Sequence, residues 1–275
     1  MVSRSFPRND RNFILTFEAR GGTVTVKPPL RIAFQADKST SGGLNKIQVK
    51  IYNLAEKNRL QLVKDAEEFN KIIPFSLSVG YQDALKLLFK GTVHTGSNQR
   101  QGPDIITTID GLDGGIGGLR GYTSRTVEGG KRAVDAAISD MLRITAGKIN
   151  ERPALSRPKV LVGNSLKLIE DMIGPDETWY IDNEQLYIIN EGDAVTNFVP
   201  LVSAATGLIN TPERENQKVT FQTLMNPSIR IGGNIKLQSV TAPHLNGIYY
   251  IETISYQGDN FGDEWSQTCT GRLSG

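Results

Sequence analysis

The chain has 275 residues, and its 31 Lys and Arg against 29 Asp and Glu give a formal net charge of +2. A hydrophobic share of 38% is enough to build real cores, which excludes a globally disordered chain. No apolar run approaches the ~20 residues of a membrane-spanning helix, and the basic N-terminus lacks the apolar segment of a secretory signal. One cysteine, Cys269, excludes an internal disulfide framework, and two histidines, His94 and His244, make a zinc site dependent on carboxylates.

Basic residues are concentrated in the first part of the chain. Residues 1–60 contain eleven Lys and Arg but four Asp and Glu, so this part carries +7 and the remainder −5. Such an excess indicates either a basic surface for an acidic partner or nucleic acid, or an ordinary solvated face. No stacking aromatics alternate with these residues, so the pattern of a single-strand nucleic-acid binder is absent.

The first section alternates apolar and polar residues with period two, which predicts half-buried strands. At Asn53 the period changes, and Asn53 with Glu56 resembles a capping box. We therefore predict a helix over residues 54–69, with a buried face formed by Leu54, Leu62 and Phe69. The strands predicted for this section are residues 13–17, 23–26, 30–34, 46–52, 75–81, 85–94 and 105–111.

A glycine-rich stretch, residues 113–118, separates this section from the next. Gly115 and Gly117 begin a G-x-G pattern, but Arg120 stands in the place of the third glycine and no helix is expected to begin there. The pattern therefore favours a hinge or linker over a dinucleotide site.

The middle section has the pattern of a small α/β unit. Apolar residues at helical spacing predict a helix over residues 131–146 with Val134, Ala137, Ile138, Met141 and Leu142 on one face. A cap around Asn164 predicts a second helix over residues 165–173. Two short strands, residues 178–182 and 185–189, complete the unit.

The third section returns to strands and partly repeats the first. Its predicted strands are residues 219–221, 234–239, 247–256 and 264–270, with a long hairpin loop over residues 258–263. Residues 88–93 and 105–111 resemble residues 247–251 and 265–271, which is a weak signal of internal duplication. The predicted fold is mainly β (α+β), with two β-barrel-like modules flanking a small α/β domain. The predicted domains are residues 1–115, 116–198 and 199–275.

Several short motifs, in this order, resemble the baseplate or tail-tip hub proteins of bacteriophages and of related contractile injection systems. The strand, cap and helix of residues 45–54 match the opening of that family. The other matching pieces, which extend the resemblance over residues 15–272, are residues 78–81, 88–93, 206–212, 224–227, 246–249 and 258–259 and Trp265.

The resemblance implies a structural role in the virion. Hubs of this family form a homotrimer whose chains each contribute two tube-type barrels, so the ring is pseudo-sixfold. It would adapt the hexameric tail tube to the trimeric spike and form part of the channel for the genome and the tape-measure protein. Other baseplate proteins are further partners; DNA would be present only in transit, and the chain is not expected to anchor in a membrane. Assembly would take place in the host cytoplasm. The equivalent hub of a phage-derived bacteriocin or secretion system is an alternative.

Two sets of carboxylates are the candidates for a catalytic site. Asp110 with Asp113, or Asp259 with Asp263 and Glu264, could form an acid–base pair, and the second set a loose Ca²⁺ loop. Both sets lie in glycine-rich turns, where Asp is common for turn chemistry. We therefore predict no enzyme activity, no hydrolysis of peptidoglycan, no cofactor and no metal. We also expect no lysozyme-like or spike-helix extension.

Two other readings concern exposed contacts. Trp179 and Trp265 could stack on sugars in a carbohydrate- or receptor-binding tail component, or they could be core or interface aromatics. The N-terminal arm contains Pro7 and no apolar periodicity, so we expect it to be extended and to clasp a neighbouring chain. The candidate interface residues are Arg4, Arg8, Arg11, Asp259, Asn260 and Phe261.

Overall fold

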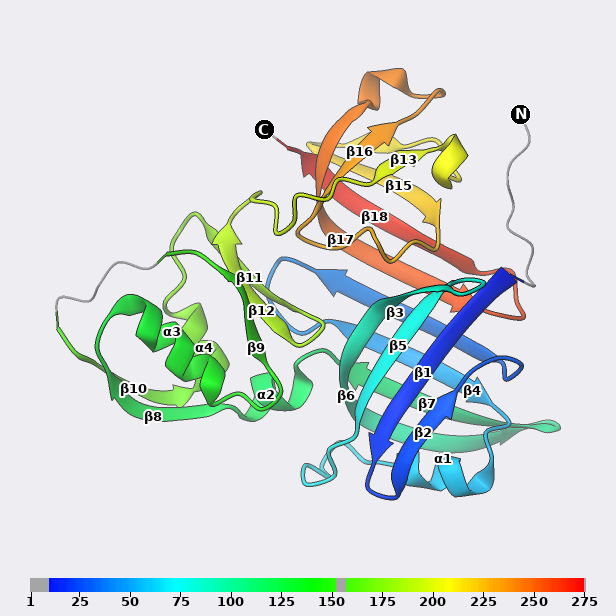
Figure 1. Ribbon diagram of the computed structural model, residues 1–275, viewed down its shortest axis with the longest axis horizontal. Coiled ribbons are helices and arrows are strands. Elements are labelled where there is room, and N and C mark those ends of the chain that lie inside the picture. Colours follow the sequence, from blue (N-terminus) through cyan, green and yellow to red (C-terminus); the bar gives the residue numbers. More distant parts are fainter. Residues whose placement is uncertain (1–9, 152–156, 275) are drawn as a thin grey trace.

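A computed structural model describes residues 10–151 and 157–274, and most of its elements are strands of one long sheet (Figure 1). The prediction of a mainly β fold is confirmed. The strands of this sheet are β1 (Arg11–Ala19), β2 (Gly22–Val26), β3 (Ile32–Ser39), β4 (Lys46–Tyr52), β5 (Pro74–Tyr81), β6 (Ala84–Gln101), β7 (Asp104–Leu112), β13 (Leu201–Ser203), β14 (Glu213–Glu215), β15 (Lys218–Leu224), β16 (Asn234–Gln238), β17 (Gly247–Asp259) and β18 (Trp265–Leu273).

The long sheet joins the first and third sections of the chain. Its hydrogen-bonded order is β14-β15-β18-β17-β3-β4-β7-β6-β5-β1-β2, with β16 beside β17 and β13 beside β16. The junction is the antiparallel pair of β3 and β17, whose register runs from Ser39 opposite Thr253 to Ala33 opposite Asp259. The strand pairs of the described residues leave an open path from β14 to β2 rather than two separately closed barrels.

Period-two alternation explains why these residues form a two-faced sheet. In β4 the apolar residues Ile47, Val49 and Ile51 are buried, and the polar residues between them are exposed. The buried side chains of β3, β4, β15, β17 and β18 meet those of β1, β2, β5 and β6 in one continuous core. The sheet therefore has an apolar face inside and a polar face outside over much of its length.

The middle section forms a separate unit beside the long sheet, on the left of Figure 1. One small sheet has the order β11-β12-β9, the other pairs β10 with β8, and helices α3 and α4 pack between them. The strands at residues 178–182 and 185–189 are confirmed as β11 and β12. The elements are α2 (Gly115–Arg120), β8 (Tyr122–Val127), α3 (Gly130–Ser139), β9 (Thr145–Ile149), β10 (Lys159–Asn164), α4 (Ser165–Glu170), β11 (Glu177–Asp182) and β12 (Gln185–Asn190).

The first helix differs from the prediction. Helix α1 spans Glu56–Leu62 rather than residues 54–69, and Asn53 does not cap it. Asn53 has a φ of 55°, and its side chain bonds Asp104 and the backbone N–H of Ile105 at 2.8 and 3.0 Å. The predicted capping box is wrong because this side chain is tied to the start of β7 instead. Leu54 and Leu62 are buried as predicted, but Phe69 lies beyond the helix and is 44% exposed.

The glycine-rich stretch forms helix α2, so the prediction of a hinge without a helix is wrong. Glycine serves close packing here, because a Cβ at Gly117 would lie 2.3 Å from the carbonyl oxygen of Leu142. A short helix can therefore pack directly on the middle section.

The other helices confirm the predicted types but are shorter. Helix α3 ends at Ser139, so Leu142 is 53% exposed although the four preceding residues of the predicted stripe are buried. Helix α4 ends at Glu170, and its predicted cap is confirmed, since Asn164 Oδ1 accepts a hydrogen bond from the Lys167 N–H at 3.1 Å. Strands β8, β9 and β10 were not predicted. Two 3₁₀ turns, η2 (Ala204–Thr206) and η3 (Pro243–Leu245), complete the described chain.

No helix among the described residues is both long and apolar enough to cross a membrane.

Candidate functional site

The polar face of the long sheet extends across the first and third sections of the chain. Directly opposed residues share a face, so the strand registers trace rows of side chains across the sheet. One row contains Gln257 on β17, Gln35 on β3, Gln48 on β4, Asp110 on β7 and Thr95 on β6. Asp110 links three of these strands, because Gln48 Nε2 and Thr95 Oγ1 donate to its carboxylate at 2.9 and 2.8 Å.

A second row lies beside the first. It contains Gln222 on β15, Thr268 on β18, Ser255 on β17, Asp37 on β3 and Lys46 on β4. Ser255 Oγ donates a hydrogen bond to Asp37 Oδ1 at 2.7 Å across the junction of the two sections. Hydroxyl, amide and carboxylate groups therefore cover the sheet continuously from the third section into the first.

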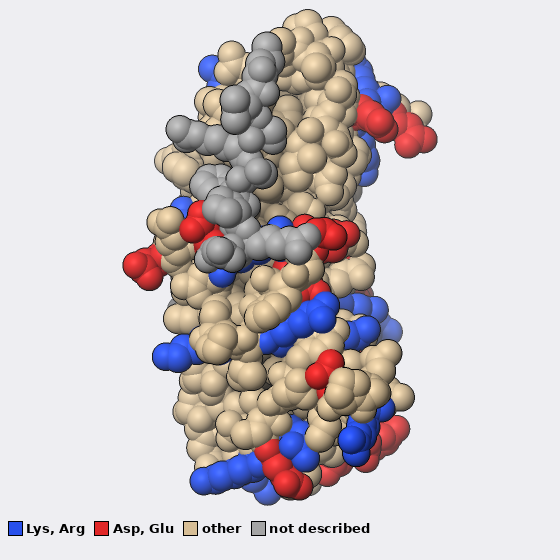
Figure 2. Space-filling model, turned by 90° about the vertical axis from the view of Figure 1, so that its right-hand side faces the viewer, with Lys and Arg blue, Asp and Glu red and all other residues tan. Residues whose placement is uncertain are grey.

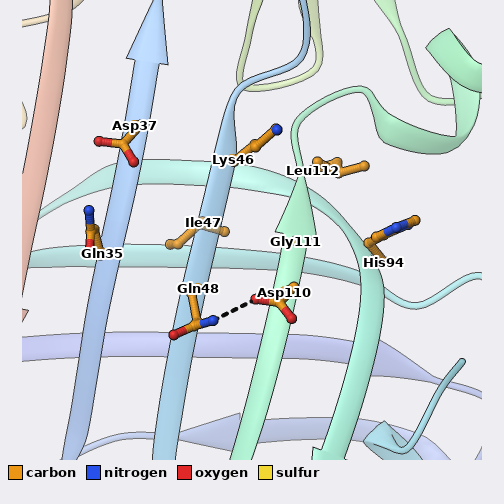
Figure 3. A pocket seen from close by; sticks show the side chains of 9 residues that line it. All are labelled: Gln35, Asp37, Lys46, Ile47, Gln48, His94, Asp110, Gly111 and Leu112. Atoms are coloured by element: carbon orange, nitrogen blue, oxygen red, sulfur yellow. Dashed lines mark hydrogen bonds between the residues drawn. The ribbon is translucent and has the colours of Figure 1, made fainter. Parts of the chain in front are cut away.

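An open groove follows this face. Figure 3 shows Gln35, Asp37, Lys46 and Gln48 standing on β3 and β4, with His94 on β6 at the other side. The groove lining contains both signs of charge and uncharged amides. Opposite charges and neutral polar groups are therefore mixed along this groove.

Charges of both signs are also interspersed on a side of the molecule at right angles to the first view. Figure 2 shows Lys and Arg beside Asp and Glu there, with most of the surface carrying neither. The basic excess of residues 1–60 is partly matched within the chain: Arg31 pairs with Asp259 at 2.7 Å, and Lys38 with Asp182 at 2.5 Å. These contacts reduce the basic surface that the sequence suggested.

The hairpin loop between β17 and β18 is fastened to the start of the chain. Arg11 donates to the backbone oxygens of Asp259 and Gly262 at 2.9 and 2.7 Å. Asn260 bonds the backbone of Leu30 and Ile32 at 3.0 and 2.8 Å. The loop therefore joins the first and third sections at the end of the β3–β17 junction.

Arg31 and the loop's own backbone hold the Asp259 carboxylate. Phe261 N–H and Gly262 N–H donate to it at 2.9 and 2.8 Å. Burial alone would raise the pKa of Asp259, but these hydrogen bonds and the Arg31 guanidinium hold it below its ordinary value. Asp259 is thus a loop-forming carboxylate rather than a proton donor.

The predicted interface residues fall into three groups. Arg4 and Arg8 lie outside the described residues. Arg11, Asp259 and Asn260 come together in the loop contact just described, where they bind within the chain. Phe261 projects from the same loop and is 56% exposed. Their role between chains stays a prediction.

A buried ion cluster docks the middle section on the long sheet. The β11–β12 turn places Asp182 against Lys38 of β3, with Nζ 2.5 Å from Oδ1, and both side chains are 3% exposed. Arg230 of the third section reaches the other oxygen at 2.7 Å. Burial alone would raise the pKa of Asp182, but Lys38 and Arg230 hold it below its ordinary value. All three sections of the chain therefore meet at one carboxylate.

The sequence contained a signal for this cluster. Lys38 follows Phe34 and Ala36 at spacing two, so it occupies a core-facing position of β3. A charged residue in such a position needs a buried partner. The predicted strand ended at residue 34, so the signal was missed.

Asp113 lies behind the same turn. Its carboxylate accepts hydrogen bonds from the N–H groups of Asn183 and Glu184 at 2.5 and 2.7 Å. Burial raises the pKa of Asp113 to about 7, although the charge of Lys38 and these hydrogen bonds act in the opposite direction. Below this pKa the folded chain holds a proton at this contact that the unfolded chain releases.

We expect the contribution of Asp113 to the free energy of unfolding to fall as the pH rises from about 5 to 8. A carboxyl group with a raised pKa binds its proton more tightly in the folded chain than in the unfolded chain, where its pKa is about 3.9. The contribution is complete below that unfolded value and is lost as the pH rises through the folded value, by at most about 1.4 kcal/mol per unit. Urea unfolding at several pH values measures it. Asp113→Asn should flatten the profile, and an unchanged slope in that variant would contradict the assignment.

The candidate catalytic and sugar-stacking residues pack or bond within the folded chain. Asp110 lies on the polar face, whereas Asp113 is fully buried, so the two do not form an exposed pair. Trp179 and Trp265 are 8% and 2% exposed, so both are core aromatics. Among the described residues no group of three or more His, Cys, Asp or Glu is placed to hold a metal ion.

The fold is that of known tail proteins. The tail protein from Neisseria meningitidis MC58 is 9% identical at a TM-score of 0.63, over 96% of this chain and 97% of that one. The 43 kDa tail protein of prophage MuSo2 from Shewanella oneidensis is 9% identical at a TM-score of 0.62, over 95% of this chain and 97% of that one. The E. coli c3393 protein is 10% identical at a TM-score of 0.62, over 94% of this chain and 77% of that one. It is described as a type VI secretion component similar in structure to the T4 tail proteins gp27 and gp5. Identities this low establish the fold alone.

Among curated proteins no sequence matches this chain. The family model of baseplate hub gp41, however, matches residues 13–271. The chain belongs to this family of structural proteins of the bacteriophage tail, which confirms the family resemblance seen in the sequence motifs.

Proposed function

We propose that the chain is the structural hub of a phage tail baseplate or tail tip, where it forms a homotrimeric pseudo-sixfold ring. The observation that carries the proposal is a repeated strand order. The path β3-β4-β7-β6-β5 of the first section recurs as β14-β15-β18-β17-β16 in the third. Three chains with two such modules each present six similar units, which is what a joint between a hexameric tube and a trimeric spike requires.

The proposal assigns a role to each part of the molecule. The tube-type β modules at residues 1–115 and 199–275 form the ring and close into a barrel only together with the neighbouring copies, and residues 116–198 are a peripheral α/β domain. The polar sheet face lines the channel for the genome and the tape-measure protein. The partners are the tail tube protein, the spike or tip protein and neighbouring baseplate proteins, in a particle assembled in the host cytoplasm. The role is not enzymatic.

Native mass spectrometry of tail tips extracted from the particle tests the ring. We expect three copies of the chain, together with threefold density around the tail axis in a cryo-electron reconstruction. Six copies or one copy would contradict the hub assignment. A peripheral position would favour the receptor-binding alternative instead.

One fold relative favours a second candidate. The E. coli c3393 protein is described as a component of a type VI secretion system. The same ring could therefore serve as the hub of a phage-derived bacteriocin or secretion machine. Presence or absence of DNA in the purified particle distinguishes these from a phage.

The N-terminal arm carries a separate prediction. We propose that Arg4 and Arg8 bind a neighbouring chain, whereas Arg11 fastens the hairpin loop of its own chain. Removal of residues 1–9 should leave the unfolding midpoint unchanged but reduce assembly into tails. The reduction should be strongest at low salt, because added salt screens the exposed charge contacts of the intact arm, over about 8 Å at physiological ionic strength. Arg11→Ala is the matched comparison and should lower the midpoint. Full phage titre from the truncated chain at all salt concentrations would exclude the arm's role.

A further inference from the structure

The two modules correspond residue by residue, not only in strand order. In the β6–β7 hairpin Val93 lies opposite Gly111, and the pairing shifts by one residue before Thr95. In the β17–β18 hairpin Ile251 lies opposite Gly271, and the same shift occurs before Thr253. The two β-bulges therefore align β6 with β17 and β7 with β18.

The alignment extends to the first strand of each module. Lys46 lies opposite Asp37 in the first module, and its counterpart Lys218 lies opposite Glu215 in the second. Strand β14 is thus the counterpart of β3. Counting from the bulges, Ser97 is the counterpart of Ser255, which lies opposite Asp37 at the junction.

The junction between modules is present once inside the chain and lacks a second copy. Strand β3 pairs with the far half of β17, but among the described strands its counterpart β14 pairs with β15 alone. The far half of β6 pairs with β7 on one edge, and on its other edge the described chain supplies one bridge, at Gly96. Unpaired strand edges of this kind are sites where another chain can add.

We propose that β14 of one copy pairs antiparallel with the far half of β6 of the next copy, repeating the β3–β17 junction between chains. The register is Glu213 opposite Gln99, Arg214 opposite Asn98 and Glu215 opposite Ser97. This inference rests on the proposed trimer and specifies how its ring closes.

The ends of the two strands fit this register. At Gly96 the outer edge is already occupied, because its N–H and carbonyl exchange hydrogen bonds with the backbone of Lys64, each at 2.8 Å. The counterpart position on the incoming strand is Asn216, where a φ of 55° turns the chain away after Glu215. Inside the chain the corresponding pair, Lys38 and Ile254, continues the junction. The intermolecular ladder therefore stops where both partners end it.

Side-chain chemistry repeats as well. Ser255 Oγ donates to Asp37 Oδ1 at 2.7 Å inside the chain, and the counterparts Ser97 and Glu215 are again a hydroxyl and a carboxylate. Both are exposed, on the polar face of the sheet. The hydrogen bond between helix α1 and β6 comes from Asn98, whose side chain alternates with Ser97 and lies on the opposite face. The channel wall would then continue without a break from one copy to the next.

Disulfide trapping tests the register in assembled tail tips. Glu215→Cys with Ser97→Cys places two cysteines in a directly opposed pair, where cross-strand distances allow a disulfide. The native Cys269 does not compete, because it is fully buried and burial raises its pKa to about 12. Asp37→Cys with Ser255→Cys is the matched positive control, since the same geometry yields a bond within one chain. Glu215→Cys with Asn98→Cys shifts one cysteine to the opposite face.

We expect covalent dimers and trimers on non-reducing gels for Glu215→Cys with Ser97→Cys, lost on reduction, and at least a tenfold lower yield for the shifted pair. A trimer by native mass spectrometry that fails to cross-link, while the Asp37–Ser255 control does, would overturn this junction and leave the hub intact. Particles with no trimer would overturn the proposed function and this inference together. Equal cross-linking of the shifted pair would also overturn the register.

Discussion

Replacement of Lys38 by Met should lower the free energy of unfolding by about 3–5 kcal/mol, the cost of removing one partner from a buried ion pair. Lys38 and Asp182 are each 3% exposed along the side chain, so water cannot take the place of the missing ammonium. Arg230 still contacts Asp182, but that side chain is 42% exposed and its charge is partly screened. The buried carboxylate would therefore be left under-compensated.

Urea unfolding monitored by circular dichroism and by tryptophan emission measures this loss and tests whether the transition has two states. Lys46→Met is the matched control, because Lys46 is exposed on the adjacent strand. That change should stay within about 0.5 kcal/mol. A loss below about 1 kcal/mol for Lys38→Met would mean that Arg230 alone stabilises Asp182.

The same cluster controls how the middle section sits on the sheet. Asp113 binds the backbone of the β11–β12 turn, and Glu184 of that turn pairs with Lys90 and Arg143 at 2.9 and 2.8 Å. In the Lys38→Met variant we therefore expect faster amide exchange in β11 and β12 than in β4. Uniform acceleration throughout the chain would indicate global rather than local loosening.

The local alternation of apolar and polar residues was sufficient to predict many strands but not to predict the polar face of the sheet. Alternation in residues 46–52 identifies which side chains of β4 point inward, because the period of a strand is two. It does not identify the neighbouring strand, and the β3–β17 pair joins residues more than two hundred positions apart. The polar face becomes a site only through that pairing. The sequence therefore indicates which polar side chains lie on the outer face of each strand, but not how they align across neighbouring strands.

The predictions of where helices begin were wrong for a different reason. The Asn53 side chain has two possible backbone partners, a helix N-terminus or a neighbouring strand, and tertiary contact with β7 decides between them. Glycines around residue 117 indicated flexibility by composition, yet they allow close backbone packing in α2. In both cases the deciding atoms belong to distant segments, which local spacing does not report.

Replacement of Trp265 by Ala should lower the free energy of unfolding by about 3–5 kcal/mol, as for other buried aromatic truncations. Trp265 is 2% exposed and packs edge-on against Phe34 of β3, with ring centroids 5.7 Å apart. Gly258 makes room for this contact, because a Cβ there would lie 2.3 Å from the Phe34 ring. Since Phe34 and Trp265 come from the two modules, the cavity would open at the junction itself.

The variant also provides its own local readout. Trp179 becomes the single tryptophan and reports on the middle section, whereas circular dichroism reports mainly on the strands. We expect unfolding followed by circular dichroism to show the full loss in the free energy of unfolding. Phe261→Ala, in the same hairpin but 56% exposed, is the matched control and should change the free energy by less than about 0.5 kcal/mol. Trp265→Phe retains a ring against Phe34 and should fall between the two. If Trp265→Ala were no more destabilising than Phe261→Ala, the junction would not depend on this aromatic pair, and the β3–β17 ladder alone would have to hold the modules together.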